Sequence, residues 1–222
     1  MLHLGYPYKS YLSITGLQHS WLSREIIAVI AFNAVLAVFT WIWWKHISHS
    51  SLRKWFGTLS SVIGVAMIFV SAQVYYQMPI HQTWHSWTTI ASFILTGVMI
   101  GTVYIYYFIS RTKEGEHPLQ LFSILISGVL ILMIIVFGVY SQNLFNGIEA
   151  ASAASLTLSS SLFWVRIVFS LIVPASLLLY LFKSKKPTHS RFAFMTALLV
   201  IVGEFSGRLL FYYTVMSQQP WF

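Results

Sequence analysis

The chain has no cysteine and no aspartate among its 222 residues, and only 8% of its residues are charged. Without cysteine it forms no disulfide and holds no thiolate-bound iron–sulfur cluster of its own. A soluble domain carries about 25% charged residues, so this composition excludes an ordinary soluble domain. Residues 1–22 lack the apolar core of a cleavable signal peptide. The net charge of +8 comes mainly from short segments between apolar runs, so it does not indicate nucleic-acid binding.

Long apolar runs make up most of the sequence, and 57% of the residues are hydrophobic. A helix needs about 20 apolar residues to cross the hydrocarbon core of a bilayer. Six runs satisfy this length and predict an all-α, polytopic membrane helix bundle with six transmembrane helices. Residues 1–222 are expected to form a single membrane domain, with 1–25 as an outer segment. The predicted spans are Ile26–Trp44, Phe56–Tyr76, Thr88–Ile109, Leu119–Tyr140, Leu162–Phe182 and Phe192–Met216.

Basic residues occur in alternate loops, which predicts the orientation of the chain. Lysine and arginine are found in loops 45–55, 110–118 and 183–191, whereas loops 77–87 and 141–161 carry neither. Cytoplasmic loops are enriched in these residues, so the basic loops are expected to face the cytoplasm and both termini to face outward.

Glu25 is an acidic residue at the start of the first apolar run, after a possible helix N-cap at Ser23. One interpretation is that Glu25 complements the helix dipole. The other is that Glu25 accepts a proton at the membrane edge, because ionisable groups at bilayer depth are costly and usually functional. The neighbouring Arg24 is then expected to keep the carboxylate ionised.

His3 is the second candidate in the outer segment. A lone histidine near a chain start is usually an incidental surface residue. However, imidazole is well suited to bond a quinol hydroxyl and to take its proton near neutral pH. The functional interpretation of His3 is a hydrogen bond to a quinol hydroxyl, and both interpretations stay open on the residues alone.

Glu204 and Arg208 lie four residues apart in the last span, and therefore on one helix face. Gly203 and Gly207 form a G-x-x-x-G motif on the adjacent stripe. The favoured interpretation is a structural intramembrane ion pair with close helix packing. The alternative is that the pair shapes or charges a cavity beside a substrate. Arg166 has the same ambiguity, with snorkelling to the interface favoured.

The eight histidines predict neither haem nor a metal site. A haem inside a bundle would normally need two axial histidines well within the spans, but all eight lie outside the apolar runs or at their ends. His81 and His85 are four residues apart, but they lie in a proline-flanked loop and make a weak ligand pair.

Three motifs resemble the membrane anchor subunits of dimethyl sulfoxide reductase, the DmsC family. They are M-L-H-L-G-x-P at Met1–Pro7, L-S-x-E-I at Leu22–Ile26 and E-x-x-G-R-x-x-F-Y at Glu204–Tyr212. The stretch Trp84–Gly101 is a weaker fourth match. The motifs are collinear with the family pattern over nearly the whole chain, although the first two family helices are expected to be missing before Met1.

The resemblance implies a haem-free anchor in the bacterial cytoplasmic membrane. Such anchors oxidise menaquinol and pass its electrons to an iron–sulfur electron-transfer subunit. That subunit supplies a molybdopterin catalytic subunit on the outer side of the membrane, in anaerobic respiration. The quinol-site histidine and glutamate of the family match His3 and Glu25. The resemblance therefore implies a quinol site that contains His3, Arg24 and Glu25, with Glu25 and His3 as its catalytic residues. The partners are thus an iron–sulfur subunit, a molybdopterin subunit and the lipid bilayer, with no nucleic acid.

Two other functions stay open at this stage. A small-solute transporter would show broken helices or several polar residues at mid-membrane; Pro174 interrupts one span, but only one intramembrane charge pair is evident. A purely structural tether would hold a partner without binding quinol. The residues of this chain do not specify the terminal electron acceptor, the quinone type, the stoichiometry of the complex or whether Met1 marks a truncation.

Overall fold

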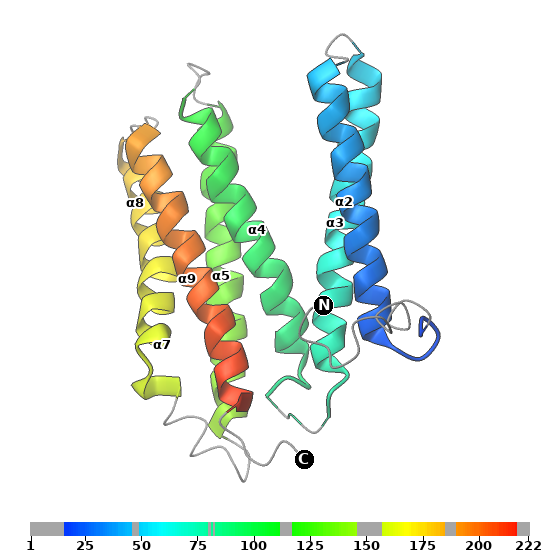
Figure 1. Cartoon of the computed structure of the whole chain (residues 1–222). Coiled ribbons are helices and arrows are strands. Elements are labelled where there is room, and N and C mark those ends of the chain that lie inside the picture. Colours follow the sequence, from blue (N-terminus) through cyan, green and yellow to red (C-terminus); the bar gives the residue numbers. More distant parts are fainter. Residues whose placement is uncertain are drawn as a thin grey trace. The chain divides into compact units, whose positions relative to one another are not determined.

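A computed structural model shows six helices that are long and apolar enough to cross a membrane, which confirms the prediction. It describes residues 16–45, 49–79, 81, 83–111, 117–145, 157–184 and 190–216, and these contain no strand. The helices are α2 (Trp21–Lys45), α3 (Ser50–Tyr76), α4 (Trp87–Ile109), α5 (His117–Phe145) and α9 (Ser190–Met216), together with a fifth span built from three segments (Figure 1).

The fifth span changes its helical geometry along its length. It begins as α7 (Ser161–Arg166), widens into a π-helix, η2 (Ile167–Ile172), and continues as α8 (Val173–Ser184). The hydroxyl of Ser160 caps its start by accepting a hydrogen bond from the backbone N–H of Leu162, at 3.3 Å. Pro174 is the second residue after the π-helix and has no N–H for the helical ladder, so the wider turn lies next to a point where the regular α-helical pattern is already interrupted.

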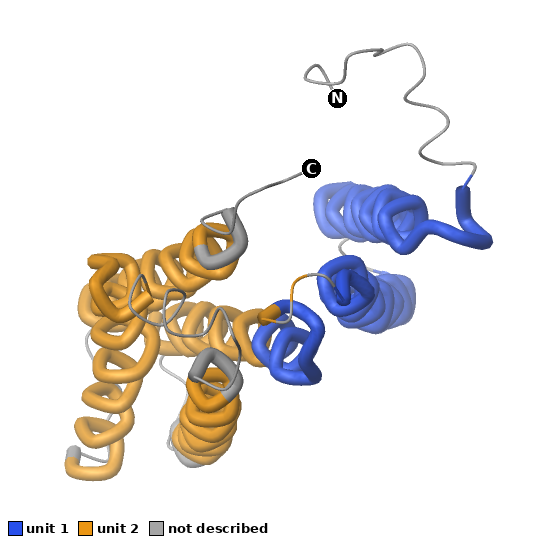
Figure 2. Tube along the Cα trace, turned by 90° about the horizontal axis from the view of Figure 1, so that it is seen from below, with its two compact units in different colours: residues 1–80, 84–94 blue, residues 81–83, 95–222 orange. Residues whose placement is uncertain are grey.

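The chain divides into two compact units (Figure 2). The first comprises residues 1–80 and 84–94, and contains α2, α3 and the first two turns of α4. The second comprises residues 81–83 and 95–222, and contains the rest of α4 and all later helices.

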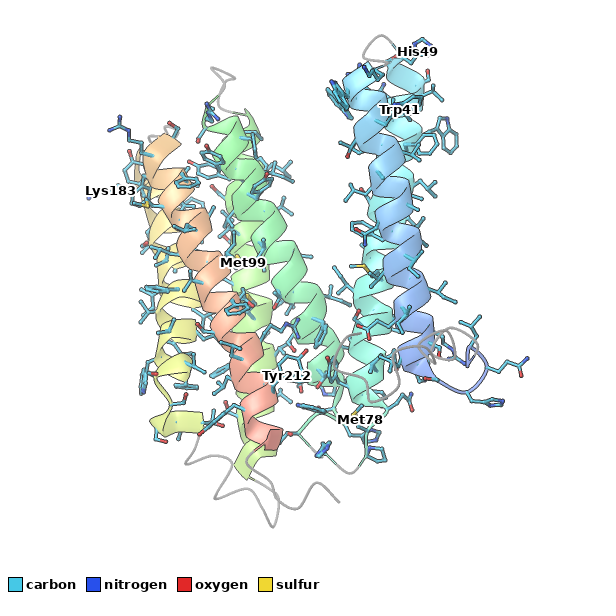
Figure 3. All side chains as sticks on the ribbon, viewed as in Figure 1. Trp41, His49, Met78, Met99, Lys183 and Tyr212 are labelled. Carbon is cyan, nitrogen blue, oxygen red and sulfur yellow. The ribbon has the colours of Figure 1, made fainter. Side chains whose placement is uncertain are left out.

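The first unit is built on an antiparallel hairpin of α2 and α3. Two phenylalanine rings of α2 pack against glycines of α3. A Cβ atom at Gly64 would lie 3.1 Å from Phe32, and one at Gly57 would lie 3.3 Å from Phe39. At the end of the hairpin marked by Trp41 and His49 in Figure 3, the Arg53 guanidinium lies 4.5 Å from the centroid of a Trp43 ring. Met78 marks the opposite end.

The second unit buries an apolar core and presents large apolar side chains outward. Ile124, Leu179 and Phe205 are each more than 60% exposed, as expected for residues that face lipid. Aromatic contacts join the helices, including Phe137 of α5 with Phe163 of α7 at 5.7 Å between ring centroids. The core residues that are almost completely buried include Met99, Val103, Tyr106, Ile126, Leu177 and Val200.

Candidate functional site

The start of α2 differs from the prediction by five residues. The helix begins at Trp21 instead of Ile26, so Arg24 and Glu25 are helical. Ser20, rather than Ser23, occupies the cap position, and its hydroxyl accepts a hydrogen bond from the backbone N–H of Ser23 at 3.4 Å. The sequence-based boundary came too late because it followed only the apolar residues, whereas the helix continues through the polar residues of the membrane interface.

Arg24 connects the start of α2 to the segment before it. Its guanidinium donates hydrogen bonds to the carbonyl oxygens of Leu17, at 2.9 Å, and Gln18, at 3.0 Å. The same group lies 4.4 Å from the ring centroid of Trp21. These contacts give Arg24 a positioning role, because they hold the turn at residues 16–19 against the first turn of the helix. Its predicted role in quinol binding stays a prediction.

Glu25 lies beyond the first turn of α2, which contains no acidic residue. The dipole effect falls off within that turn, so complementing the dipole does not account for this acid. Glu25 is half-buried and lies seven residues before Phe32, which contacts Gly64 of α3. Residues seven apart share a helix face, so Glu25 belongs to the stripe of α2 that faces α3.

His3 lies outside the described residues. That His3 and Glu25 lie together in one site therefore stays a prediction. The described part of the outer segment reaches back to Gly16, which lies against the first turn of α2: a Cβ atom there would be 3.0 Å from the Ser23 hydroxyl.

Aromatic rings gather in the first unit around the last turn of α3. Tyr75 makes an edge contact with the buried Trp84, at 5.1 Å between centroids, and packs against Phe93 of α4 at 5.6 Å. The antiparallel register of α2 and α3 follows from two contacts, Phe39 with Gly57 and Phe32 with Gly64. Seven residues further along each helix, the same register places Glu25 at the level of Ser71. Glu25 is thus about one helical turn from the level of Tyr75, at the same end of the hairpin.

His85 is a residue that the sequence analysis set aside. Its ring stacks on Tyr76 at 4.9 Å between centroids, and its Nδ1 lies against the Tyr76 carbonyl oxygen. A carbonyl only accepts hydrogen bonds, so a hydrogen bond between the two requires Nδ1 to carry a proton. The four-residue spacing of His81 and His85 gave no hint of this arrangement, because the partner of His85 is a backbone atom.

Glu204 of α9 is a buried acid of the second unit, with 2% of its surface exposed. Its Oε2 accepts a hydrogen bond of 2.6 Å from the hydroxyl of Thr96 in α4. The sequence identified Glu204 but not Thr96, because 108 residues separate the two and nothing local connects them. The predicted pairing of Glu204 with Arg208 stays a prediction.

Gly203 and Gly207 confirm the close helix packing predicted from the G-x-x-x-G motif. A Cβ atom at Gly203 would lie 2.8 Å from the backbone nitrogen of Ser170 in η2, and one at Gly207 would lie 2.6 Å from Nε of Arg166. The Arg166 guanidinium lies 5.9 Å from the centroid of Phe137. Arg166 therefore lies across α9, a packing role that goes beyond the predicted snorkelling to the interface.

Removal of the Thr96 hydroxyl is expected to destabilise the second unit. Valine has nearly the shape of threonine but cannot donate to Glu204, so Thr96→Val leaves a buried carboxyl oxygen without its partner. We expect a loss of about 1–2 kcal/mol in the free energy of unfolding. Thr102→Val is the matched control, since Thr102 of the same helix donates only to the Val98 carbonyl. The thermal unfolding midpoint of the purified complex measures both, and equal shifts would contradict the assigned contact.

Across the described ranges, no group of three histidine, cysteine, aspartate or glutamate residues is arranged to hold a metal ion. The acids and histidines of these ranges are instead dispersed over the two units, with Glu25 and His85 in the first and Glu204 in the second.

The sequence is similar to anchor subunits of a known class of oxidoreductase. Residues 1–213 match the family described as DMSO reductase anchor subunit (DmsC). A relative from the anaerobic dimethyl sulfoxide reductase of Haemophilus influenzae is 30% identical over 216 residues, which cover 96% of this chain and 74% of the relative. The YnfH chain of the anaerobic dimethyl sulfoxide reductase of Escherichia coli is 26% identical over 218 residues, with the same coverage.

A more distant likeness covers part of the sequence. A sulfite dehydrogenase subunit of Allochromatium vinosum is 27% identical over 109 residues, or 45% of this chain and 34% of the relative. No solved structure matches. The family match over nearly the whole chain and the six apolar helices establish a multi-pass membrane protein whose family works with catalytic and electron-transfer subunits. The chain belongs to the DMSO reductase anchor subunit family, DmsC, and is the membrane anchor of a molybdenum oxidoreductase complex.

Proposed function

We propose that this anchor oxidises menaquinol at the end of the α2–α3 hairpin where Glu25 lies. Glu25 accepts a proton from the quinol, and His3 bonds the quinol hydroxyl. The observation that supports this most directly is the position of Glu25: an acid beyond the first turn, half-buried, on the stripe facing α3. A carboxylate that only capped the helix would lie in the first turn.

Menaquinol oxidation releases two protons and two electrons. As the family of anchor subunits implies, the electrons pass to an iron–sulfur subunit and then to a molybdopterin subunit; this chain has no cysteine with which to hold a cluster of its own. The basic loops predict that the Glu25 end faces outward, which lets the protons leave on that side. If the electrons leave on the same side, the reaction moves no net charge across the bacterial cytoplasmic membrane.

The surroundings of Glu25 in the first unit suit an aromatic headgroup. The rings of Tyr75, Trp84 and Phe93 gather about one turn away along the hairpin. Aromatic rings pack favourably against one another in offset or edge geometry. Arg24 contributes by holding Leu17 and Gln18, which lie just before α2.

The double variant His3→Ala, Glu25→Gln tests the proposal in the complete complex. We expect it to assemble in the membrane and to lose both menaquinol-driven reduction of the terminal acceptor and binding of a fluorescent quinol analogue. A soluble reductant that feeds the partner subunits directly should still drive the complex at the unmodified rate. Full-speed menaquinol oxidation by the double variant would refute the assignment, and analogue binding equal to that of the unmodified complex would favour a structural tether.

A further inference from the structure

Among the described residues of the second unit, three buried side-chain polar atoms have no hydrogen-bond partner. One is the hydroxyl oxygen of Thr83, which precedes α4, and the two inside the membrane spans are Oε1 of Glu204 and the hydroxyl oxygen of Ser170. Glu204 is 2% exposed and Ser170 is completely buried. Both residues lie in spans long and apolar enough to cross the membrane, where each unsatisfied polar group costs several kcal/mol. A stable protein is therefore expected to supply a partner for both atoms.

Ser170 differs from eight other hydroxyl residues inside the helices in its hydrogen bonding. In an α-helix a serine or threonine hydroxyl commonly donates to the carbonyl four residues earlier. Ser170 lies in the π-helix η2, whose wider turn changes the position of the preceding carbonyls, and its hydroxyl does not make this bond. The residues that do make it are Thr40, Ser60, Ser61, Thr102, Ser127, Ser141, Thr196 and Ser206.

The close approach of η2 to α9 brings the two atoms to the same level of the unit. A Cβ atom at Gly203 would lie 2.6 Å from the Ser170 hydroxyl oxygen. Ser170 thus lies against the residue that immediately precedes Glu204. Thr96 binds the other carboxyl oxygen of Glu204 and so fixes the side chain, leaving Oε1 as the atom to be satisfied.

We propose that Oε1 of Glu204 and the hydroxyl of Ser170 share one internal water molecule, which makes Thr96, Ser170 and Glu204 a water-binding site inside the membrane part of the protein. Buried waters bind where two to four polar groups converge, and they satisfy groups that the protein leaves unpaired. The site lies within the second unit and does not depend on the quinol proposal, which concerns the first.

The site gives the carboxyl group of Glu204 a contact with exchangeable hydrogen, although the side chain is buried. An infrared band of that carboxyl group, identified by its loss in Glu204→Gln, is expected to shift when the complete complex is transferred from H₂O to D₂O. The variant Ser170→Ala removes one of the two ligands of the water and is expected to abolish or clearly reduce this shift. Ser206→Ala is the matched control, because the Ser206 hydroxyl donates to Val202 of its own helix; it should leave the shift unchanged.

A structure of the complete complex at a resolution that shows ordered water provides the direct measurement. We expect density within hydrogen-bonding distance of both Glu204 Oε1 and Ser170 Oγ. A direct contact between these two atoms without density between them would overturn the proposal. So would the Arg208 guanidinium on Oε1, the pairing predicted from their spacing. A solvent shift that is the same in Ser170→Ala and in Ser206→Ala would also overturn it.

Discussion

Glu25→Gln is expected to lower menaquinol-driven turnover of the complete complex by about 100-fold or more, while assembly is retained. A positioned general base typically contributes a factor of 10²–10⁴. Glutamine keeps the size of the side chain and an oxygen that accepts hydrogen bonds, but it cannot take up a proton. The variant therefore removes proton acceptance with little change in shape. The rate of acceptor reduction with menaquinol as donor measures this effect, normalised to the rate with a soluble reductant.

Glu25→Asp separates proton acceptance from simple packing. Aspartate keeps the carboxylate but withdraws it by one methylene group, so we expect partial activity, above that of the glutamine variant. If Glu25 serves only to fill the stripe between α2 and α3, the order should be reversed, because glutamine has the better fit. A glutamine variant with the turnover of the unmodified complex would contradict a role in proton transfer.

Gly203→Ala is expected to have the largest effect on stability, at about 3 kcal/mol or more in the free energy of unfolding. The new Cβ atom would lie 2.8 Å from both the Cβ of Phe169 and the backbone nitrogen of Ser170. These two atoms are a backbone nitrogen and a Cβ atom attached directly to the backbone of η2, so they cannot move unless η2 itself shifts. We expect a complex that accumulates poorly in the membrane and unfolds at a clearly lower temperature.

Two other glycines provide graded controls for this substitution. At Gly207 the atoms in the way are Nε and Cδ of Arg166, which belong to a flexible side chain, so Gly207→Ala should cost less. At Gly138 nothing lies within 4 Å of the added atom, and Gly138→Ala should be neutral or stabilising by up to about 1 kcal/mol. If all three variants unfold at the same temperature, the close approach of η2 to α9 is wrong.

The sequence was sufficient to predict the helices because bilayer thickness fixes their minimum length. It did not predict the start of α2 at Trp21, because polar residues at the interface remain helical without being apolar. It also gave no sign of the π-helix at Ile167–Ile172, although Pro174 indicated an interruption of that span. A change of helical type alters hydrogen bonding over a few residues and leaves the apolar composition unchanged.

The candidate sites were predictable only as single residues. Glu204 is evident as an acid within an apolar run, and Gly203 indicates close packing. Their partners Thr96 and Ser170 come from other helices, and a single sequence contains no information on which helices meet. Glu25 was predicted from its position and the family motif, whereas the ring cluster around Tyr75 depends on how α3, the following loop and α4 fold together.

The packing of Phe32 and Phe39 against the glycines of α3 has a consequence for biogenesis. All of these contacts join residues between Trp21 and Tyr76, so the hairpin is complete in itself as soon as that stretch has been synthesised. Chains fold from the N-terminus during translation, and short-range contacts form before long-range ones. The α2–α3 pair is therefore able to enter the bilayer and pack together while the ribosome is still making α9. The hydrogen bond between Thr96 and Glu204, in contrast, forms only after the last helix has been inserted.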